Sequence, residues 1–141
     1  MIEELQFHHV GIAVSDLEAT AAKYRQGGWR TSAVIYDPVQ QVNICWLTRD
    51  GNPVLELLEP VGAESPVRRT LEKNGVTPYH ICYQTPELEP AVAALRAQRY
   101  VLVSKPAPAA AMAGCRVCFL FHKDVGLVEL AEAPATIPQP E

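Results

Sequence analysis

Residues 7–18 read FHHVGIAVSDLE, and a related stretch, PYHICYQTPELE, follows at residues 78–89. A shift of 71 residues places His80 on His9 and aligns the two stretches without a gap. The first stretch begins with apolar and β-branched residues typical of a strand and continues into a helix-capping pattern. Because internal repeats indicate duplicated structural units, this match decides how the rest of the chain is interpreted.

A second match lies further along each copy, where a strand-like segment carries a glutamate. With a shift of 73 residues, LVEL at 127–130 falls on VLEL at 54–57, so that Glu129 matches Glu56. A loop insertion in one copy of a duplicated unit would produce the two-residue difference between the shifts. The chain therefore consists of two copies of one unit, each with one strand-borne histidine and one strand-borne glutamate.

Both copies predict the same order of elements: a strand, a helix and three further strands. In the first copy, Ser15 and Asp16 resemble a helix N-cap and Gly27-Gly28 a helix end. The expected strands are 7–14, 30–36, 42–48 and 54–59, then 79–84, 100–104, 115–121 and 125–131, with the second helix at 87–98. We therefore predict an α+β fold in which two βαβββ modules, about 7–60 and 79–132, form a cleft-shaped eight-stranded mixed sheet.

Three segments lie outside these elements. A linking helix is expected at 65–73, with Ser65 as its cap and a proline at its first position. Residues 106–114 are rich in small residues and predict a loop. Residues 1–133 are expected to form a single domain, and 134–141, with three prolines in eight residues, a disordered tail that joins no core.

Length and charge exclude several classes of protein. The 141 residues suit one domain, and 16 acidic against 12 basic residues give a net charge of −4, which would repel a nucleic acid backbone. Hydrophobic residues make up 48% and charged residues 20%, close to globular averages, and no apolar run approaches the ~20 residues of a membrane span. The acidic start, Met1-Ile2-Glu3-Glu4, lacks the basic residues of a signal peptide, so we expect a cytoplasmic protein.

The four cysteines are expected to be buried thiols in a reducing compartment. Cys115 and Cys118 have the spacing of a zinc or redox pair. They lie in a predicted strand, however, where residues three apart point to opposite faces. We therefore expect no metal site at this pair.

Four side chains stand at equivalent strand positions in the two copies: His9, Glu56, His80 and Glu129. If the copies are related by a pseudo-twofold axis, the four side chains converge. Two imidazoles and two carboxylates suit a divalent Co, Ni, Mn, Fe or Zn ion. The alternative is that each histidine is a satisfied core residue and each glutamate is solvated. Both glutamates lie among Leu and Val, however, where an unpaired carboxylate is costly to bury, and a shared cation would remove that cost.

Several motifs make the resemblance to a known family specific. The sequence is similar to the vicinal oxygen chelate superfamily, which includes the glyoxalases and bleomycin resistance proteins, and within it to the methylmalonyl-CoA epimerases. The match spans about Phe7 to Glu132. The motifs that carry it are HVGIAV at 9–14, DLE at 16–18, LELLEP at 55–60, SPV at 65–67, LEK at 71–73, YHIC at 79–82 and GLVEL at 126–130.

The resemblance implies an enzyme that binds one divalent metal in a cleft between paired modules, through His9, Glu56, His80 and Glu129. It implies an acyl-CoA substrate and α-proton abstraction, a reaction that needs a carboxylate base and a positive centre for the enolate oxygen. Glu129 is the expected catalytic residue. We also expect a homodimer and no nucleic acid or membrane partner.

Further residues are expected to contact the substrate. Some epimerases carry a second acid on the third strand of the first module, where this chain has Asn43 and no carboxylate, so α-proton exchange is expected to outpace inversion. Cys82 shares a strand face with His80 and is expected to line the cleft. Arg116, Lys123 and Lys105 are candidates for contacts with CoA phosphates. His8 is expected to point away from His9 and outward.

Two other functions fit the same pattern. A glyoxalase I-like lyase would use the same two histidines and two glutamates. A binding protein that sequesters a small molecule would use the cleft without turnover and would need no metal ligands. The epimerase motifs favour a metal-dependent isomerase of a methylmalonyl-CoA-like thioester over both.

Overall fold

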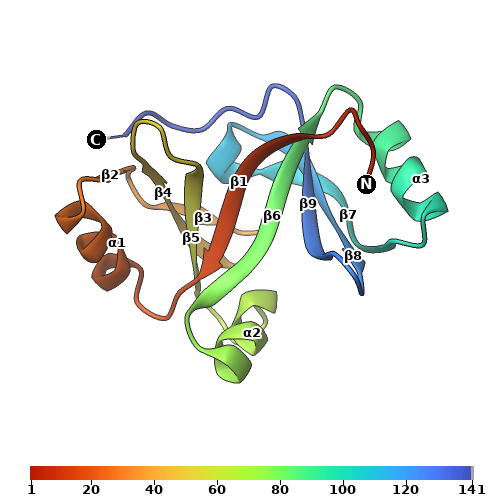
Figure 1. The fold of residues 1–141 in the computed structure, drawn as a ribbon. Helices are drawn as coiled ribbons and strands as arrows, with labels where there is room; N and C mark the ends of the chain where they lie inside the picture. Colours follow the sequence, from red (N-terminus) through yellow and green to blue (C-terminus); the bar gives the residue numbers. More distant parts are fainter. Residues whose placement is uncertain (141) are drawn as a thin grey trace.

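A continuous mixed β-sheet runs through the computed structural model, which describes residues 1–140 (Figure 1). The strand order is β2-β4-β5-β1-β6-β9-β8-β7, and β3 pairs with β4 outside this path. The strands are β1 (Gln6–Ala13), β2 (Arg30–Thr31), β3 (Ile35–Asp37), β4 (Val42–Thr48), β5 (Val54–Pro60), β6 (Thr77–Thr85), β7 (Val101–Ala109), β8 (Cys115–His122) and β9 (Gly126–Glu132). The helices are α1 (Leu17–Gln26), α2 (Pro66–Asn74) and α3 (Leu88–Ala97), with a 3-10 turn at Ala110–Met112.

The sheet has the predicted internal symmetry. In the first module β1 pairs with β5 in parallel, and in the second β6 pairs with β9 in parallel. The modules join through the antiparallel pair β1 and β6, in which His9 lies opposite Cys82. The prediction of two βαβββ modules in one mixed sheet is therefore confirmed.

The sheet has nine strands because the segment expected at 30–36 is split into β2 and β3, which both pair with β4. Ser32 lies at the interruption. Its backbone N–H donates to the carbonyl of Trp46, but its side-chain hydroxyl, rather than its backbone carbonyl, accepts the bond from the Trp46 N–H, at 2.9 Å. A side chain thus replaces the main chain in the ladder, and the regular strand stops.

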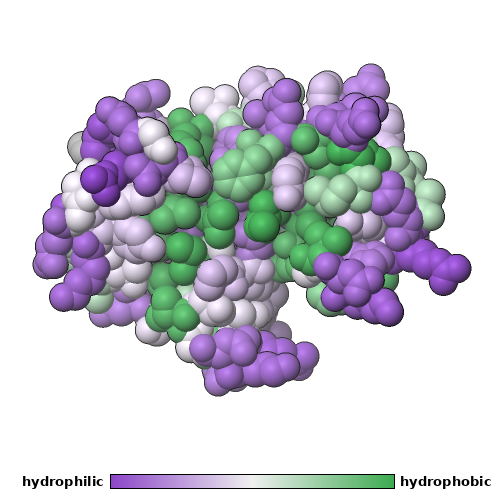
Figure 2. All heavy atoms as spheres, in the orientation of Figure 1, coloured by the Kyte–Doolittle hydropathy of each residue, from purple (hydrophilic) through white to green (hydrophobic). Residues whose placement is uncertain are grey.

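Helices α1 and α3 cover the two ends of one face of the sheet (Figure 1). Leu17 and Ala21 of α1 pack with Cys45, Leu47 and Leu57. Leu88, Ala91 and Leu95 of α3 pack with apolar residues of β8 and β9. Strands β1 and β6 run between the two helices, and hydrophobic residues gather over them in Figure 2. The opposite face of the sheet carries a separate core built around residues such as Ile44, Trp46 and Met112.

The two modules cap their helices in the same way. The Glu59 carboxylate accepts a hydrogen bond from the backbone N–H of Leu17, the first residue of α1, at 2.8 Å. In the second module, Glu132 accepts one from Leu88, the first residue of α3, at 3.2 Å. Both glutamates lie three residues after the glutamate that the repeat matches. Carboxylates at helix N-termini satisfy free N–H groups and suit the helix dipole.

Two segments differ from the expectation. Strand β7 continues to Ala109, through residues that were expected to form a loop. Because β7 is an edge strand, prolines such as Pro106 and Pro108 are tolerated in it. The pairing of β7 with β8 shows register shifts between Leu102 and Ala107. In the C-terminal segment, Ala135 and Ile137 pack against the core on the cleft face of the sheet, so this segment does join a core. Ile137 is the only large apolar residue in this segment, so little in the sequence indicated that the segment would pack against the core.

Helix capping gives a test of this fold. Asp16 accepts a hydrogen bond from Ala19 N at 3.0 Å, whereas the buried Ser65 hydroxyl at the start of α2 makes no capping bond. Asp16→Ala should lower the free energy of unfolding by about 1 kcal/mol, and Ser65→Ala should not lower it. Urea denaturation of both variants measures the difference. Equal losses in the two variants would contradict the assignment of the caps.

Candidate metal centre

Four neighbouring strands each carry one member of a buried cluster. The strands β5, β1, β6 and β9 lie side by side in the sheet, and their side chains alternate between its two faces. The members of the cluster are Glu56, His9, His80 and Glu129, all on the face opposite to α1 and α3. Each of the four residues is at most 3% exposed.

The four side chains converge on one point. The Nε2 of His9 lies 3.2 Å from Glu56 Oε1, from Glu129 Oε1 and from His80 Nε2. The Nε2 of His80 lies 3.4 Å from Glu56 Oε1 and 3.2 Å from Glu129 Oε1. The predicted convergence of these side chains is therefore confirmed.

The spacing of these atoms fits a metal ion. Atoms that lie 3.2–3.4 Å apart around a common centre are about 2 Å from it, which is the usual length of a bond from zinc to nitrogen or oxygen. The Oε1 of Glu129 is buried and accepts no regular hydrogen bond. Two imidazoles and two carboxylates are also a donor set that borderline divalent ions prefer. The residues present fit such an ion.

Charge also explains how the cluster is buried. Desolvation disfavours the charged form of every member, but the opposite charges outweigh it. Burial lowers the pKa of His9, yet Glu56 and Glu129 together raise it to about 9. The same carboxylates raise the pKa of His80, and the two imidazoles lower the pKa of Glu129 and of Glu56. The cluster therefore consists of complementary charges that stabilise one another.

The surroundings of the cluster fix the two imidazole rings. The indole of Trp46 lies edge-on to His9, with ring centroids 4.8 Å apart, and Phe119 lies in the same way against His80 at 5.3 Å. Gly11, opposite His80 in the β1–β6 pair, leaves room for that ring. A Cβ atom at position 11 would lie 2.3 Å from His80 Cε1, closer than atoms can approach. A glycine is therefore required here by the imidazole and not by a turn.

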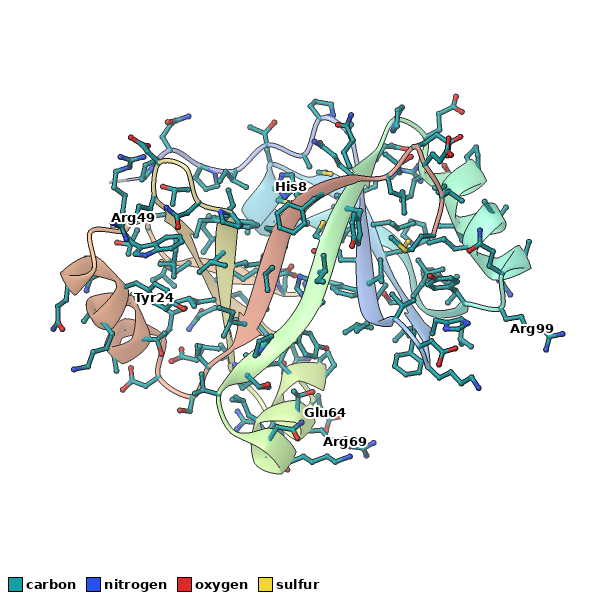
Figure 3. All side chains as sticks on the ribbon, in the orientation of Figure 1. His8, Tyr24, Arg49, Glu64, Arg69 and Arg99 are labelled. Atoms are coloured by element: carbon teal, nitrogen blue, oxygen red, sulfur yellow. The ribbon has the colours of Figure 1, made fainter. Side chains whose placement is uncertain are left out.

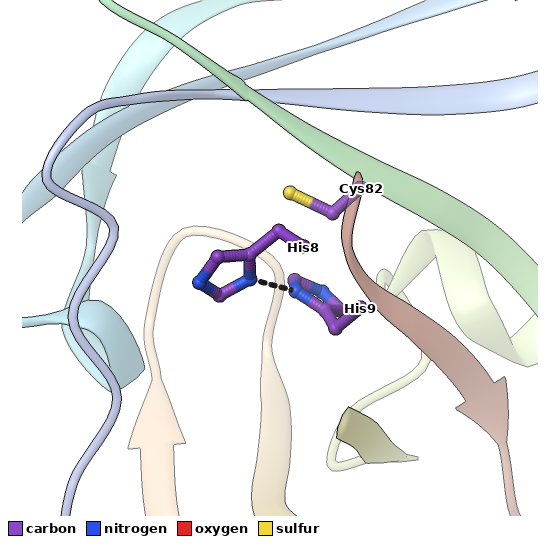
Figure 4. Close-up of side chains that lie close together, drawn as sticks. All are labelled: His8, His9 and Cys82. Atoms are coloured by element: carbon purple, nitrogen blue, oxygen red, sulfur yellow. Dashed lines mark hydrogen bonds between the residues drawn. The ribbon is translucent and has the colours of Figure 1, made fainter. Parts of the chain in front are cut away.

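His8 was expected to point away from His9, and the structure shows that this is wrong. The register of β1 shifts between Phe7 and His9, so His8 has no partner in β6. Such a β-bulge breaks the alternation of side chains. The His8 ring consequently lies on the side of His9, with its Nδ1 2.7 Å from that of His9 (Figure 4). In Figure 3 it lies along β1, whereas the labelled Arg69 and Arg99 project outward.

A pocket of about 140 Å³ lies beside the cluster. Tyr79 and Phe119 line it and also pack against His80. Phe119 pairs with Glu129 across β8 and β9, and Leu127 precedes Glu129 by two residues on the same strand face. The remaining lining residues are Asp37, Val39, Gln40, Pro66, Val103, Ser104, Lys105, Ala107, Pro108 and Val117. Both modules thus contribute to its wall.

Asn43 lies on the other face of β4. Trp46 is opposite Glu56 in the β4–β5 pair and shares its face, so Asn43, three residues before Trp46, points to the side of α1. There its amide donates to Glu59, the residue that caps α1. The lack of a carboxylate at position 43 therefore does not show whether a second acid lines the cleft. Asp37, opposite Val42 at the end of the β3–β4 pair, lines the pocket and was missed by the sequence analysis.

The other residues expected to bind substrate lie in different environments. Cys82 is fully buried beside His8 and His9, and burial raises the pKa of its thiol well above the usual value. Arg116 forms ion pairs with Glu89 and Glu132. Lys123 is exposed in the turn between β8 and β9, and Lys105 is exposed on the wall of the pocket.

The Cys115 and Cys118 thiols face opposite sides of β8, as expected. The Cys115 Sγ donates to the backbone carbonyl of Glu132 at 2.9 Å, whereas Cys118 is fully buried in the core under α3. The two thiols do not belong to a common group of potential metal ligands within residues 1–140.

Comparison with known proteins agrees with this geometry. Residues 8–119 match the glyoxalase/bleomycin resistance protein/dioxygenase superfamily. The chain belongs to this superfamily. The ethylmalonyl-CoA/methylmalonyl-CoA epimerase of Cereibacter sphaeroides is 36% identical over 133 residues, which cover 90% of this chain and 97% of that protein. Within the superfamily, the predicted similarity to methylmalonyl-CoA epimerases is thereby confirmed.

Two solved structures show the same fold. The methylmalonyl-CoA epimerase of Mycobacterium tuberculosis has a TM-score of 0.82 and 26% identity, covering 98% of this chain and 93% of that one. A variant of the Streptomyces coelicolor enzyme in complex with 2-nitronate-propionyl-CoA has a TM-score of 0.79 and 31% identity, covering 95% and 98%. As for membrane association, none of the helices within residues 1–140 is long and apolar enough to cross a bilayer.

The close approach at Gly11 gives a test of the cluster. Gly11→Ala should displace the His80 ring and thereby reduce the amount of divalent metal bound by the purified protein to well below that of the wild type. Gly27→Ala, at the end of α1 where φ is −88°, is the control and should leave metal content unchanged. Elemental analysis measures the metal, and circular dichroism shows whether both variants fold. Full metal content in Gly11→Ala would contradict the proposed role of His80.

Proposed function

We propose that this protein is a metal-dependent epimerase that acts by α-proton abstraction on a methylmalonyl-CoA-like acyl thioester. The observation that carries the proposal is the buried cluster of His9, Glu56, His80 and Glu129 beside a pocket lined by both modules. The similarity to methylmalonyl-CoA epimerases over most of the chain supports the substrate class. The proposed cofactor is one divalent Co, Ni, Mn, Fe or Zn ion.

Bound at the cluster, such an ion supplies a positive centre for the oxygen of an enolate. His9, Glu56, His80 and Glu129 would hold it. The two imidazole rings are held by aromatic packing, so their positions need little rearrangement to bind the ion. Apolar residues of the pocket wall, such as Val117, Phe119 and Leu127, would keep water from the acyl group, which strengthens electrostatic interactions there.

Of the two carboxylates, Glu129 is the proposed proton acceptor. Leu127 and Phe119, its neighbours along β9 and across to β8, line the pocket. Among the described residues, the pocket wall includes no member of β5, the strand that carries Glu56. A substrate in the pocket would therefore approach Glu129, behind Leu127 and Phe119, more closely than Glu56. A general base must come within hydrogen-bond reach of the proton that it removes.

Inversion of configuration also needs a proton donor for the opposite face of the substrate. Asp37 is the acidic side chain on the pocket wall, and it comes from the first module, whereas the neighbours of Glu129 come from the second. Backbone N–H groups of Val39 and Gln40 donate to its Oδ1 and hold it in place. We therefore propose Asp37, rather than any residue at position 43, as the second proton-transfer group.

Binding of the CoA portion is proposed to involve cations outside the metal cluster. Lys105 is the strongest candidate because it lies on the pocket wall and has no ion-pair partner among the described residues. Arg116 and Lys123 are also proposed to contact phosphates, although Arg116 would have to share its guanidinium with Glu89 and Glu132. Cys82 is proposed to shape the cleft floor beside His9.

The protein is proposed to act as a homodimer in the cytoplasm. On the face of the sheet that carries α1 and α3, the stretch of β1 and β6 between the two helices is uncovered, and there Phe7 is 47% and Ile81 is 40% exposed. Phe7 packs edge-on against Tyr83 on the same face. An apolar strip of this kind on paired strands suits self-association by a second copy. The four free cysteines suit a reducing compartment.

Exchange of the α-proton tests the reaction. Glu129→Gln should lower deuterium incorporation into methylmalonyl-CoA by about 10² to 10⁴, because an amide cannot accept the proton. Glu72→Gln, on the exposed side of α2, is the matched control and should not change the rate. NMR in D₂O measures incorporation, and the metal content of each variant is determined in parallel.

Asp37 is tested by comparing exchange with inversion. Asp37→Asn should retain α-proton exchange but lose most of the inversion, which chiral analysis of the product measures. Exchange and inversion that fall together would contradict a separate role for Asp37. If no acyl-CoA exchanges its α-proton with the metal-loaded wild type, the epimerase proposal fails and a lyase or a binding protein takes its place.

The proposed dimer has its own test. Ile81→Glu places a charge on the exposed apolar strip and should convert the protein to a monomer, whereas Val125→Glu, in the turn between β8 and β9, should not. Light scattering coupled to size-exclusion chromatography should give the mass of two chains for the wild type and for Val125→Glu. A wild type with the mass of one chain would refute the dimer.

A further inference from the structure

The histidine beside the candidate ligand His9 connects it to the C-terminal segment. Because His8 occupies the bulge in β1, its ring lies between two partners. Its Nδ1 is 2.7 Å from the Nδ1 of His9, and its Nε2 is 2.6 Å from the backbone carbonyl oxygen of Ala135. Figure 4 shows the contact between the two rings. The Nε2 of His9 faces the opposite way, into the cluster.

The hydrogen-bonding capacity of these groups fixes where each proton lies. A carbonyl oxygen only accepts hydrogen bonds, so the Nε2 of His8 carries a proton and donates to Ala135. A neutral imidazole has a single N–H, which leaves the Nδ1 of His8 as an acceptor. The Nδ1 of His9 must then be the donor in the contact between the rings.

This assignment also determines the state of the other ring nitrogen of His9, Nε2. With its proton on Nδ1, a neutral His9 has the lone pair on Nε2, the atom that lies 3.2 Å from Glu56, Glu129 and His80. That is the tautomer that can bind a metal ion in the cluster. Histidine ligands commonly donate their second N–H to a carbonyl or carboxylate, which orients the ring and increases its basicity.

We propose that His8 is a positioning residue that holds His9 in its metal-binding tautomer, and that the Ala135 carbonyl in the C-terminal segment sets the direction of this hydrogen-bond chain. The inference rests on the metal centre of the proposed function. It connects the C-terminal segment to the metal site through a backbone carbonyl, although none of residues 134–140 is a member of the cluster.

The second module has no equivalent of the hydrogen bond between His8 and His9. Tyr79 matches His8 in the repeat and also lies at a register shift, between the pairs of Gly11 and Ile12. Its ring packs edge-on against His80, with centroids 5.5 Å apart. The Nδ1 of His80, however, is buried and has no hydrogen-bond partner. Only the His9 side of the cluster is thus oriented by a hydrogen bond among the described residues.

The test measures the affinity of the purified protein for Zn²⁺ by competition with a chelator. His8→Leu fills the space but offers no acceptor to His9, and it should weaken Zn²⁺ binding by about 10- to 100-fold. His8→Asn retains an acceptor oxygen near the position of Nδ1 and should recover much of that loss. The free energy of unfolding of each metal-free variant is measured in urea, to separate an effect on the ligand from an effect on the fold.

Removal of residues 134–141 tests the contribution of the Ala135 carbonyl. The truncation should weaken Zn²⁺ binding in the wild type but cause no further loss in His8→Leu, because both changes break the same chain. Ile137→Ala removes apolar packing of the segment and keeps the carbonyl, so it should bind Zn²⁺ like the wild type. Losses that simply add in the double variant would overturn the role of Ala135.

The outcomes separate this inference from the proposed function. If Glu129→Gln loses Zn²⁺ but His8→Leu binds it as tightly as the wild type, the inference is overturned and the metal centre stands. If the wild type itself binds no divalent ion, both fail. If Cys82→Ser weakens binding as much as His8→Leu while Glu129→Gln does not, the ion is held by the thiol and the two adjacent imidazoles, which also overturns the inference.

Discussion

Two carboxylates and two imidazoles are buried against one another at the centre of the sheet, and the rest of the structure is arranged around this contact. A single buried carboxylate would be strongly destabilising, but here each charge faces two opposite charges at 3.2–3.4 Å. To bring the four side chains together, the strands must lie in the order β5-β1-β6-β9, and each must pair with its neighbour in a single register. The cluster also requires a glycine at position 11, because the His80 ring occupies the space of any larger side chain.

Duplication supplies the symmetry of this centre, and the differences between the modules supply its chemistry. Each module contributes one histidine and one glutamate, and each caps its helix with a glutamate three residues further along. The surroundings are nevertheless unequal. Two neighbours of Glu129, Leu127 and Phe119, border a pocket, whereas no residue of the strand that carries Glu56 does. His9 has a hydrogen-bonded neighbour in His8, whereas His80 has an aromatic one in Tyr79. The two halves of a symmetric ligand set can therefore take different roles.

Some of the site could be predicted and some could not, for a reason that two residues illustrate. The alternation of side chains along a strand correctly placed Cys115 and Cys118 on opposite faces. The same rule failed at His8, because a register shift in β1 interrupts the alternation. Asn43 was chosen because some epimerases carry a second acid on the corresponding strand, but its register with β5 turns it toward α1. A bulge and a register depend on the partner strand, which local sequence does not describe.

The sequence by itself determined the duplicated βαβββ units, the family and the four residues of the buried cluster, because a repeat and the burial of charged residues among aliphatic ones are properties of the chain alone. Tertiary structure decided which side chains surround that cluster. The pocket beside Glu129, the placement of Asp37 on its wall and the docking of Ala135 on His8 each join segments far apart in the chain. Such contacts depend on how strands pair and how a C-terminal segment packs across them, and these are set by the energy of the whole fold rather than by any local pattern.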